Sequence, residues 1–444
     1  MNDASIERKA ILVQGSIAAL MVALSVISYF DRTIMSIAGP RIIQEFSLSE
    51  TEMGSVYSAF IFSYALLMIP GGHFADRFGP RLVVGIMGLG SALFTGLTAL
   101  GGRPGLGTYF GIVPSFLAIR LGLGVFTAPL YPSCAKMNSI WFPLAQRARV
   151  WGVIAAGAGI GGAVSPLLFS WMIDRFGWRT AFFVAAVVTA ALGLLWLKGV
   201  RDRPEEHPLV GSKGRSLLGL AQERAQMHNS SVPWRKLLAD RNLMLLTLSY
   251  LTVGYFEYIF FFWIFYYFVE IRHMGQSQGA IYTMALFLTW MVMTPLGGWV
   301  TDRLVLRYGR RSGRRIVPVV ALTTSAILLY VGANLQHPLA VAVVLSLALG
   351  FASATDGAFW ASAIDLGKTE VGAACGILNT GGNLGGFVAP MLTPFIASFA
   401  GWTWGLYFGS LVVLAGVVVW FFIDVDPVAS RLHSENVPIV RVEA

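Results

Sequence analysis

Gly71-Gly-His-Phe-Ala-Asp-Arg77 and Gly297-Gly-Trp-Val-Thr-Asp-Arg303 are two copies of one pattern, 226 positions apart. Two further pairs follow in the same order, each at an offset of 224: Gly161-Gly-Ala-Val-Ser-Pro-Leu-Leu168 with Gly385-Gly-Phe-Val-Ala-Pro-Met-Leu392, and Gly177-Trp178 with Gly401-Trp402. Matches in order at nearly one offset indicate an internal duplication. Parallel repeats of this kind predict two similar halves related by a pseudo-twofold axis.

The composition places these halves in a membrane. Of the 444 residues, 56% are apolar and only 12% are charged, about half the charged share of a soluble domain. The apolar runs are long enough for helices that cross a bilayer and too long for barrel strands. Twelve spans are predicted, at residues 12–38, 52–74, 82–101, 109–137, 147–173, 178–198, 242–269, 277–300, 315–334, 337–364, 370–397 and 402–424.

Charge distribution orients the spans. Most of the 32 Lys and Arg residues fall on one side when both termini are placed there, so the positive-inside rule predicts cytoplasmic termini. The net charge of +9 then reflects topology, and we expect no nucleic-acid partner. We expect a multi-pass monomer in a bacterial inner membrane.

The expected fold is all-α, with twelve transmembrane helices in two six-helix bundles related by a pseudo-twofold axis along the membrane normal. The predicted divisions are an N-terminal bundle at 1–199, a cytoplasmic middle loop with a short amphipathic helix at 200–240, a C-terminal bundle at 241–426 and a cytoplasmic tail at 427–444.

Five charged residues fall well inside predicted spans: Asp31, Arg32, Arg120, Glu257 and Asp356. Each charge in hydrocarbon costs about 2.5–3.5 kcal/mol, which makes these residues functional candidates, with structural ion pairs as the alternative. Adjacent helix positions face different directions, so Asp31 and Arg32 are expected to have different partners. We expect Asp31 to approach Arg120.

The duplication also pairs two carboxylates. Tyr29-Phe-Asp31 corresponds to Tyr255-Phe-Glu257 at the offset of 226, so both acids are expected at the central cavity. The aromatic run around Glu257 favours the neutral carboxyl, a property that a proton carrier needs. Asp31, Glu257 and Asp356 are the candidate proton-coupling residues; the alternative for Glu257 is a permanently protonated structural group.

Several motifs resemble those of a known family. Gly72-His-Phe-Ala-Asp76-Arg77-Phe-Gly79-Pro-Arg81 resembles the loop 2–3 signature of the major facilitator superfamily, and Asp302-Arg303 resembles its second copy. Arg120-Leu-Gly-Leu-Gly124 resembles the fourth-span motif. Four further segments are similar to the anion:cation symporter family within it: Tyr29-Phe-Asp31-Arg32, Trp141-Phe-Pro143, Gly177-Trp-Arg179 and Asn379-Thr-Gly-Gly-Asn383-Leu-Gly-Gly386.

The resemblance implies proton-coupled symport of a small organic anion, a carboxylate or sugar acid, by alternating access. It implies a substrate site formed by Tyr29, Arg32, Tyr64, Arg120, Trp360, Asn379 and Asn383. The charged loop residues Asp76, Arg77, Asp302 and Arg303 are predicted to form a gate, with helix-end capping as the alternative.

Alternative functions remain at this point. The family usually has a glutamate in the fourth span where this chain has Thr127, which favours exchange or facilitated diffusion without protons as a second hypothesis. A membrane sensor is a third, although the middle loop is too short for an output domain. We expect no enzymatic activity, no cofactor and no metal, because the sequence contains no catalytic triad, cofactor motif or His/Cys metal spacing.

Overall fold

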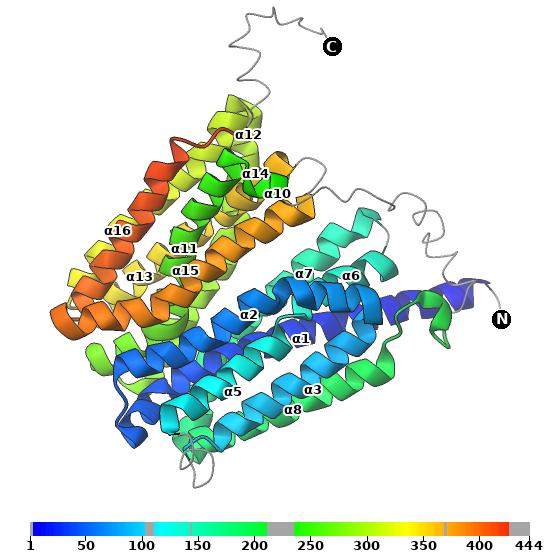
Figure 1. Ribbon diagram of the computed structural model, residues 1–444, viewed down its shortest axis with the longest axis horizontal. Helices are drawn as coiled ribbons and strands as arrows, with labels where there is room; N and C mark the ends of the chain where they lie inside the picture. Colours follow the sequence, from blue (N-terminus) through cyan, green and yellow to red (C-terminus); the bar gives the residue numbers. More distant parts are fainter. Residues whose placement is uncertain (1–2, 103–110, 143, 211–234, 368–370, 426–444) are drawn as a thin grey trace, which may run out of the picture.

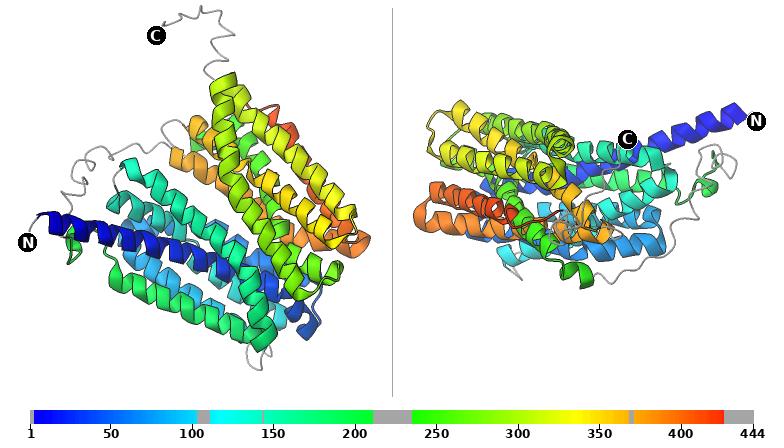
Figure 2. Two further views of the ribbon diagram at one scale, coloured as in Figure 1. Left: turned by 180° about the vertical axis from the view of Figure 1, so that it is seen from behind. Right: turned by 90° about the horizontal axis from the view of Figure 1, so that it is seen from above.

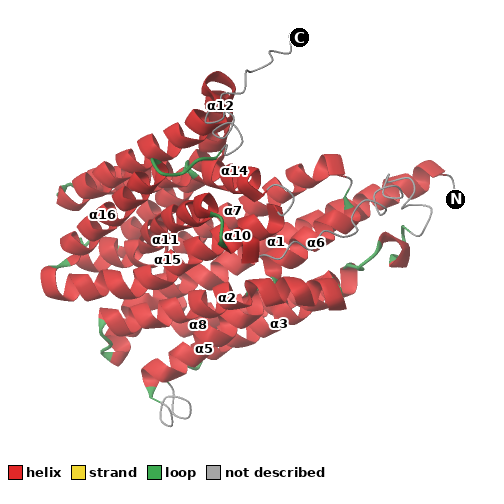
Figure 3. Cartoon of the chain, turned by 45° about the horizontal axis from the view of Figure 1, so that its top comes forward, coloured by secondary structure: helices red, strands yellow, loops and turns green. Residues whose placement is uncertain are grey.

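The computed structural model describes residues 3–102, 111–142, 144–210, 235–367 and 371–425. Within these ranges the regular elements are helices, and none is a strand (Figure 3). Ten of these helices are long and apolar enough to cross a membrane. The chain is therefore an all-helical, multi-pass membrane protein.

The elements before residue 211 form the first half, and those after residue 234 form the second half. The first half contains α1 (Asp3–Phe46), α2 (Glu50–Phe78), α3 (Pro80–Ala99), α5 (Ile112–Thr127), α6 (Leu130–Trp141), α7 (Leu144–Phe176), α8 (Trp178–Gly199) and the 3-10 turn η1 (Pro204–Glu206). The second contains α10 (Arg235–Leu238), α11 (Arg241–Tyr266), the π-helical turn η3 (Tyr267–Ile271), α12 (Gln276–Asn334), α13 (Pro338–Ser353), α14 (Asp356–Gly367), α15 (Val371–Ala400) and α16 (Trp402–Trp420).

Two spans that we predicted as single helices are broken. The span predicted at 109–137 is divided into α5 and α6 around Pro129, and the span predicted at 337–364 into α13 and α14. Proline lacks the N–H that would continue a helix, which explains the first break. The second break, at Ala354–Thr355, contains no proline. There Asp356 is the first residue of α14, and its carboxyl group lies at a helix N-terminus, where a negative charge is favourable.

The duplicated glycines pack against these breaks. A Cβ atom added at Gly71 would lie 2.9 Å from the Cα of Pro129, and one added at Gly297 would collide with the carbonyl oxygen of Ala354. Both glycines therefore allow the backbone of a neighbouring broken helix to approach closely. The sequence repeat corresponds to one packing contact made twice.

The predicted spans at 277–300 and 315–334 lie on two limbs of α12, which join at Gly309. Gly309 has a φ of 77°, a left-handed conformation that glycine adopts without steric cost. Gly313 lies directly against the backbone of Val305, so the chain reverses here. The charged segment that we predicted as a loop is therefore largely helical, with its reversal confined to one glycine.

The two halves converge at one end and diverge toward the end at which the N-terminus lies (Figures 1 and 2). At the convergent end α2 contacts α15: a Cβ at Gly54 would collide with the carbonyl oxygen of Pro390, and the Ser58 hydroxyl donates to the carbonyl oxygen of Phe387 at 2.7 Å. This region is called the seal below.

Candidate functional site

A cavity of about 260 Å³ lies between the two halves. Its polar and aromatic lining comes from α1, α2, α6 and α7 on one side and from α11, α12, α14 and α15 on the other. The lining side chains are Tyr29, Arg32, Tyr64, Met68, Tyr131, Trp151, Tyr250, Glu257, Tyr258, Phe261, Trp290, Asp356, Trp360, Asn379 and Asn383. Six of the seven residues predicted for the substrate site are among them; Arg120 is not.

Arg32 is the cation of this cavity. Its guanidinium carbon lies 4.9 Å from the ring centroid of Tyr29 and 4.8 Å from that of Tyr64. Such cation–π contacts hold the side chain in place. Its Nε and Nη2 atoms are buried and have no hydrogen-bond partner in the described part of the chain. Two parallel N–H groups without partners suit a planar carboxylate.

Asp31 and Arg120 lie behind the cavity wall. Arg120 is fully buried, with its guanidinium carbon 4.9 Å from the ring centroid of Phe60, and Asp31 is 3% exposed. The Thr189 hydroxyl donates to Asp31 Oδ2 at 3.0 Å, and Arg120 Nη1 donates to the Asp31 carbonyl oxygen at 3.5 Å. The structure brings these two residues together, but not at the cavity where sequence reasoning put them.

Two carboxyl groups line the second-half wall. Asp356 accepts a hydrogen bond from the Tyr250 hydroxyl at 3.2 Å, and the buried Glu257 Oε1 has no partner among the described residues. The two groups are near enough for the charge of Asp356 to act on Glu257. Like charges in a buried site do not readily ionise together, so the pair favours holding a proton.

The asparagines lie on α15 beside these acids. Asn379 Nδ2 contacts the Met68 sulfur at 3.1 Å across the two halves, and Asn383 Oδ1 accepts from the Tyr258 hydroxyl at 3.4 Å. The Trp360 indole N–H donates to the Tyr250 hydroxyl at 3.3 Å. All three predicted residues therefore lie at the cavity.

The predicted gate residues lie away from the cavity. Arg77 lies over the Phe78 ring at 5.4 Å, and Arg303 over the Trp299 ring at 4.8 Å. Asp302 pairs with Arg314 at 3.5 Å and its side chain is 76% exposed. Each of these contacts stays within one half. The side chain of Asp76 lies outside the described residues.

Sequence reasoning missed the residues of the seal. Glu50 accepts hydrogen bonds from the Tyr266 hydroxyl at 2.5 Å and the Trp402 indole at 3.0 Å, both from the second half. Gln44 donates to Glu270 at 3.4 Å, also across the halves. The sequence did contain one signal: Gln44 and Glu270 are separated by 226 positions, so they occupy equivalent places in the repeat.

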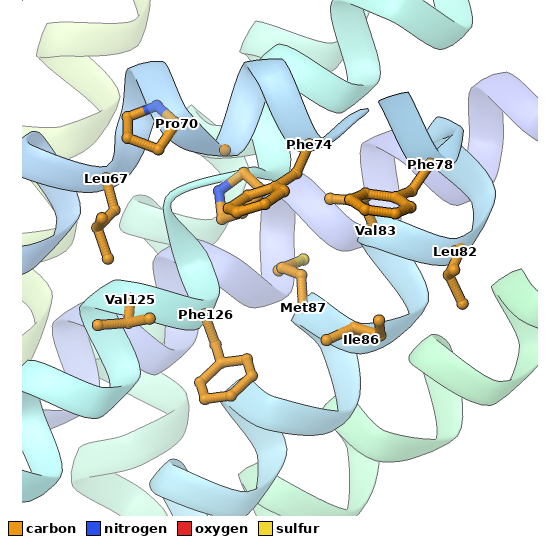
Figure 4. A pocket seen from close by; sticks show the side chains of 12 residues that line it. Leu67, Pro70, Phe74, Phe78, Leu82, Val83, Ile86, Met87, Val125 and Phe126 are labelled. Carbon is orange, nitrogen blue, oxygen red and sulfur yellow. The ribbon is translucent and has the colours of Figure 1, made fainter. Parts of the chain in front are cut away.

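A second hollow, of about 440 Å³, lies between α2, α3 and the end of α5 (Figure 4). Its side chains are apolar, with Phe74, Phe78, Met87 and Phe126 turned toward one space (Figure 4). Among the described residues, no charged side chain lines this hollow. It offers nothing to bind an anion, so the cavity between the halves is the candidate site.

Residues 21–366 and 304–441 match the family model of the Major Facilitator Superfamily. The chain belongs to the major facilitator superfamily. This establishes a transporter and not an enzyme. The fold agrees: a bacterial homolog to the human lysosomal transporter Spinster, solved in an inward-facing and occupied conformation, superposes with a TM-score of 0.77 at 15% identity over 96% of this chain and 99% of that one.

Several transporters are similar to this chain over most of their own length. The probable sulfoacetate transporter of Cupriavidus necator is 27% identical over 89% of this chain and 90% of that protein. The hexuronate transporter of Bacillus subtilis is 27% identical over 90% and 92%, and the D-galactonate transporter of Escherichia coli is 28% identical over 90% and 93%. These relatives are consistent with the anion:cation symporter family, and they support an organic-anion transporter.

Proposed function

We propose that this protein is a secondary active carrier that imports a small organic anion together with protons, by alternating access. The observation that carries the proposal is Arg32, whose unpartnered N–H groups belong to a cavity shared by both halves. A buried cation that forms no ion pair within the described residues favours an anionic ligand. The relatives named for sulfoacetate, hexuronate and galactonate support the same chemistry.

The membrane arrangement belongs to this proposal. The ten helices that are long and apolar enough to cross a membrane include α12 as a single helix and leave out α2. When α2 is added and the two limbs of α12 are counted separately, the chain crosses the bilayer twelve times. We place six crossings in each of two pseudo-twofold-related bundles, at 1–199 and 241–426, with a cytoplasmic connection at 200–240, a cytoplasmic tail at 427–444 and both termini inside a bacterial inner membrane. The seal then faces outward, and the protein acts as a monomer.

Each cavity residue has a role in this scheme. Arg32 binds the anionic group, while Tyr29 and Tyr64 hold the guanidinium between their rings. Trp360, Asn379 and Asn383 contact the remainder of the substrate. Asp31 and Arg120 act from behind the wall, where the Arg120 charge and the Thr189 hydroxyl keep Asp31 in position.

The proton is carried by Glu257, with Asp356 as the neighbour that sets its charge state. Protonation removes the repulsion between the two carboxyl groups and a negative charge from a cavity that must accept an anion. Substrate and proton therefore favour one another's binding, which is the thermodynamic requirement of symport.

The charged residues at the divergent end control the opposite state. When that end closes, Asp76, Arg77, Asp302 and Arg303 form contacts between the halves, and Asp302 exchanges its ion pair with Arg314 for such a contact. These contacts would replace those of the seal, so the two ends stabilise opposite conformations.

Reconstitution of the full chain into proteoliposomes tests the function. A panel of carboxylates and sulfonates is added outside at acidic pH, and substrate accumulation and luminal acidification are followed together. We expect saturable uptake with acidification for at least one anion, and neither signal with Arg32→Ala. Failure of every anion in both uptake and counterflow would overturn the carrier proposal.

One observation favours a second candidate, an exchanger or facilitator without protons. Thr127 is 2% exposed, and its hydroxyl lies 3.1 Å from that of Ser91 and donates to the carbonyl oxygen of Leu123 at 2.8 Å. No carboxyl group occupies this fourth-span position. Uptake that is saturable but leaves luminal pH unchanged would establish this candidate.

A further inference from the structure

The cavity is lined chiefly by aromatic rings. Nine of its lining residues carry one: Tyr29, Tyr64, Tyr131, Trp151, Tyr250, Tyr258, Phe261, Trp290 and Trp360. Aromatic faces bind flat apolar groups by stacking and by edge-to-face contact. A cavity of about 260 Å³ is smaller than a typical drug-sized pocket, which restricts the ligand to a small molecule.

Most polar atoms of the second-half wall are already paired with one another. Trp360 donates to Tyr250, and Tyr250 donates to Asp356. Tyr258 donates to Asn383, whose amide nitrogen donates to the carbonyl oxygen of Asn379 at 2.9 Å. This wall therefore presents rings rather than unused donors and acceptors to a ligand.

On the first-half wall, Tyr131 also has a paired hydroxyl group and presents its ring to the cavity. Its hydroxyl lies 3.1 Å from the Ser25 hydroxyl, and its ring meets that of Trp151 edge-on at a centroid distance of 6.2 Å. Trp151 is 38% exposed, so part of its side chain remains uncovered. A flat group placed beside it would complete an aromatic stack.

The buried cavity atoms that lack a partner gather around one ring, that of Tyr29. Arg32, with Nε and Nη2 unpaired, lies over this ring, and the Trp290 indole stacks against it at a centroid distance of 6.5 Å. The indole N–H of Trp290 lies near the carboxyl group of Glu257, and neither Trp290 Nε1 nor Glu257 Oε1 has a hydrogen bond of ordinary geometry within the described residues. Three N–H groups and one carboxyl group thus define a single polar corner, suited to one carboxylate beside a protonated acid.

We propose that the substrate is an aromatic monocarboxylate: its carboxylate binds in this polar corner and its flat ring lies between the aromatic side chains. The inference rests on the proposed function and specifies the anion. A polyhydroxylated acid would have to break the pairs of the second-half wall or leave its own hydroxyls unpaired. A second carboxylate would face Asp356, whose like charge repels it.

Binding to the purified full chain tests this substrate class. Isothermal titration at acidic pH compares benzoate, cyclohexanecarboxylate, gluconate and terephthalate. We expect benzoate to bind at least tenfold more tightly than gluconate or terephthalate, and several-fold more tightly than cyclohexanecarboxylate, which has the same ring size without a flat face. Gluconate or terephthalate binding as tightly as benzoate, or no binding by benzoate, would overturn the proposal.

Two substitutions at one position separate stacking from folding. Trp151→Phe keeps a ring and Trp151→Leu removes it, while both shorten the side chain. Benzoate affinity should fall less than threefold in the first variant and at least tenfold in the second, with the gluconate affinity unchanged by either. Equal losses in both variants, with thermal stability preserved, would exclude a ring-stacking role.

The outcomes also separate this inference from the proposed function. If benzoate does not bind but another anion shows saturable, proton-linked uptake in proteoliposomes, the carrier stands and the aromatic substrate class is wrong. If no anion is taken up while benzoate binds in the cavity, the cavity chemistry stands and the carrier proposal is wrong.

Discussion

Asp31 and Arg32 are adjacent in α1, yet only Arg32 lines the cavity; Asp31 turns away and accepts a hydrogen bond from Thr189. Successive helix residues are rotated by about 100°, which is enough to place neighbours on different faces. One step along the helix therefore separates a cation that lines the cavity from a buried acid whose backbone carbonyl oxygen accepts a hydrogen bond from Arg120.

Loss of the cavity cation should weaken binding directly. Arg32→Ala removes charge-assisted hydrogen bonds worth about 1.5–3 kcal/mol, so we expect roughly a 10- to 150-fold weaker Kd for the transported anion. Arg32→Lys keeps the positive charge but lacks the two parallel N–H groups, so its Kd should lie between those of the unaltered protein and of Arg32→Ala. Titration calorimetry checks both variants, and an unchanged Kd in Arg32→Ala would contradict the assigned role.

Arg120 should act on stability together with Asp31. Arg120 bonds to the backbone carbonyl oxygen of Asp31 and its charge lies near the Asp31 carboxyl group, so removing either side chain changes the surroundings of the other and lowers stability. We expect Arg120→Met and Asp31→Asn each to lower the melting temperature, and the double variant to lose less than the sum of the two. Thermal unfolding of the four proteins measures this coupling. Strictly additive losses would show that the two side chains do not depend on each other.

The role of Glu257 predicts a separation of binding from coupling. Glu257→Gln mimics the protonated acid permanently, so substrate binding and counterflow should persist while accumulation driven by a pH gradient is lost. Asp356→Asn, its matched control, should leave gradient-driven uptake in place with a shifted pH dependence. Gradient-driven accumulation in Glu257→Gln would transfer the proton role to Asp356 or Asp31.

The seal predicts a change of conformation without a change of ligand. Glu50→Gln weakens the hydrogen bonds to Tyr266 and Trp402, so a cysteine introduced at the cavity should become more reactive from the seal side. Glu52→Gln is the control, because Glu52 bonds to Ser49 in the capping box of α2. Equal labelling of both variants, or a changed order of ligand preference in Glu50→Gln, would contradict the assignment.

The duplication and the apolar spans predicted the helical membrane fold, because both are properties of long stretches. The helix breaks were missed: Pro129 marks the first, but prolines inside other helices, such as Pro166 in α7, leave no comparable break. Whether a proline ends a helix depends on the neighbours that pair the freed backbone groups. The second break, at Ala354–Thr355, contains no proline that could have indicated it.

Only part of the candidate site was predicted from the sequence. Arg32, Glu257 and Asp356 were found because charge inside a span is rare. Tyr250, Trp151 and Trp290 were missed because apolar helix faces do not show which side meets a cavity when lipid and cavity are both lined by aromatic residues.

Asp31 was placed at the cavity on the strength of the repeat, but equivalence in the repeat does not conserve the direction of a side chain. Glu257 lines the cavity in the second half, whereas its counterpart Asp31 is enclosed by α5 and α8. The repeat also aligns Arg32 with Tyr258, and both of these residues do line the cavity.

The bonds of Glu50 to Tyr266 and Trp402 exist only while the seal is closed, far from the groups that recognise the substrate. In the proposed transport cycle, reopening that end requires these bonds to be exchanged for water, whether or not a ligand is bound. The return of the unloaded carrier, and with it the maximal turnover rate, would then depend on the seal, while the choice of substrate depends on the cavity. Speed and selectivity can thus be altered by separate substitutions, and a faster carrier need not be a less discriminating one.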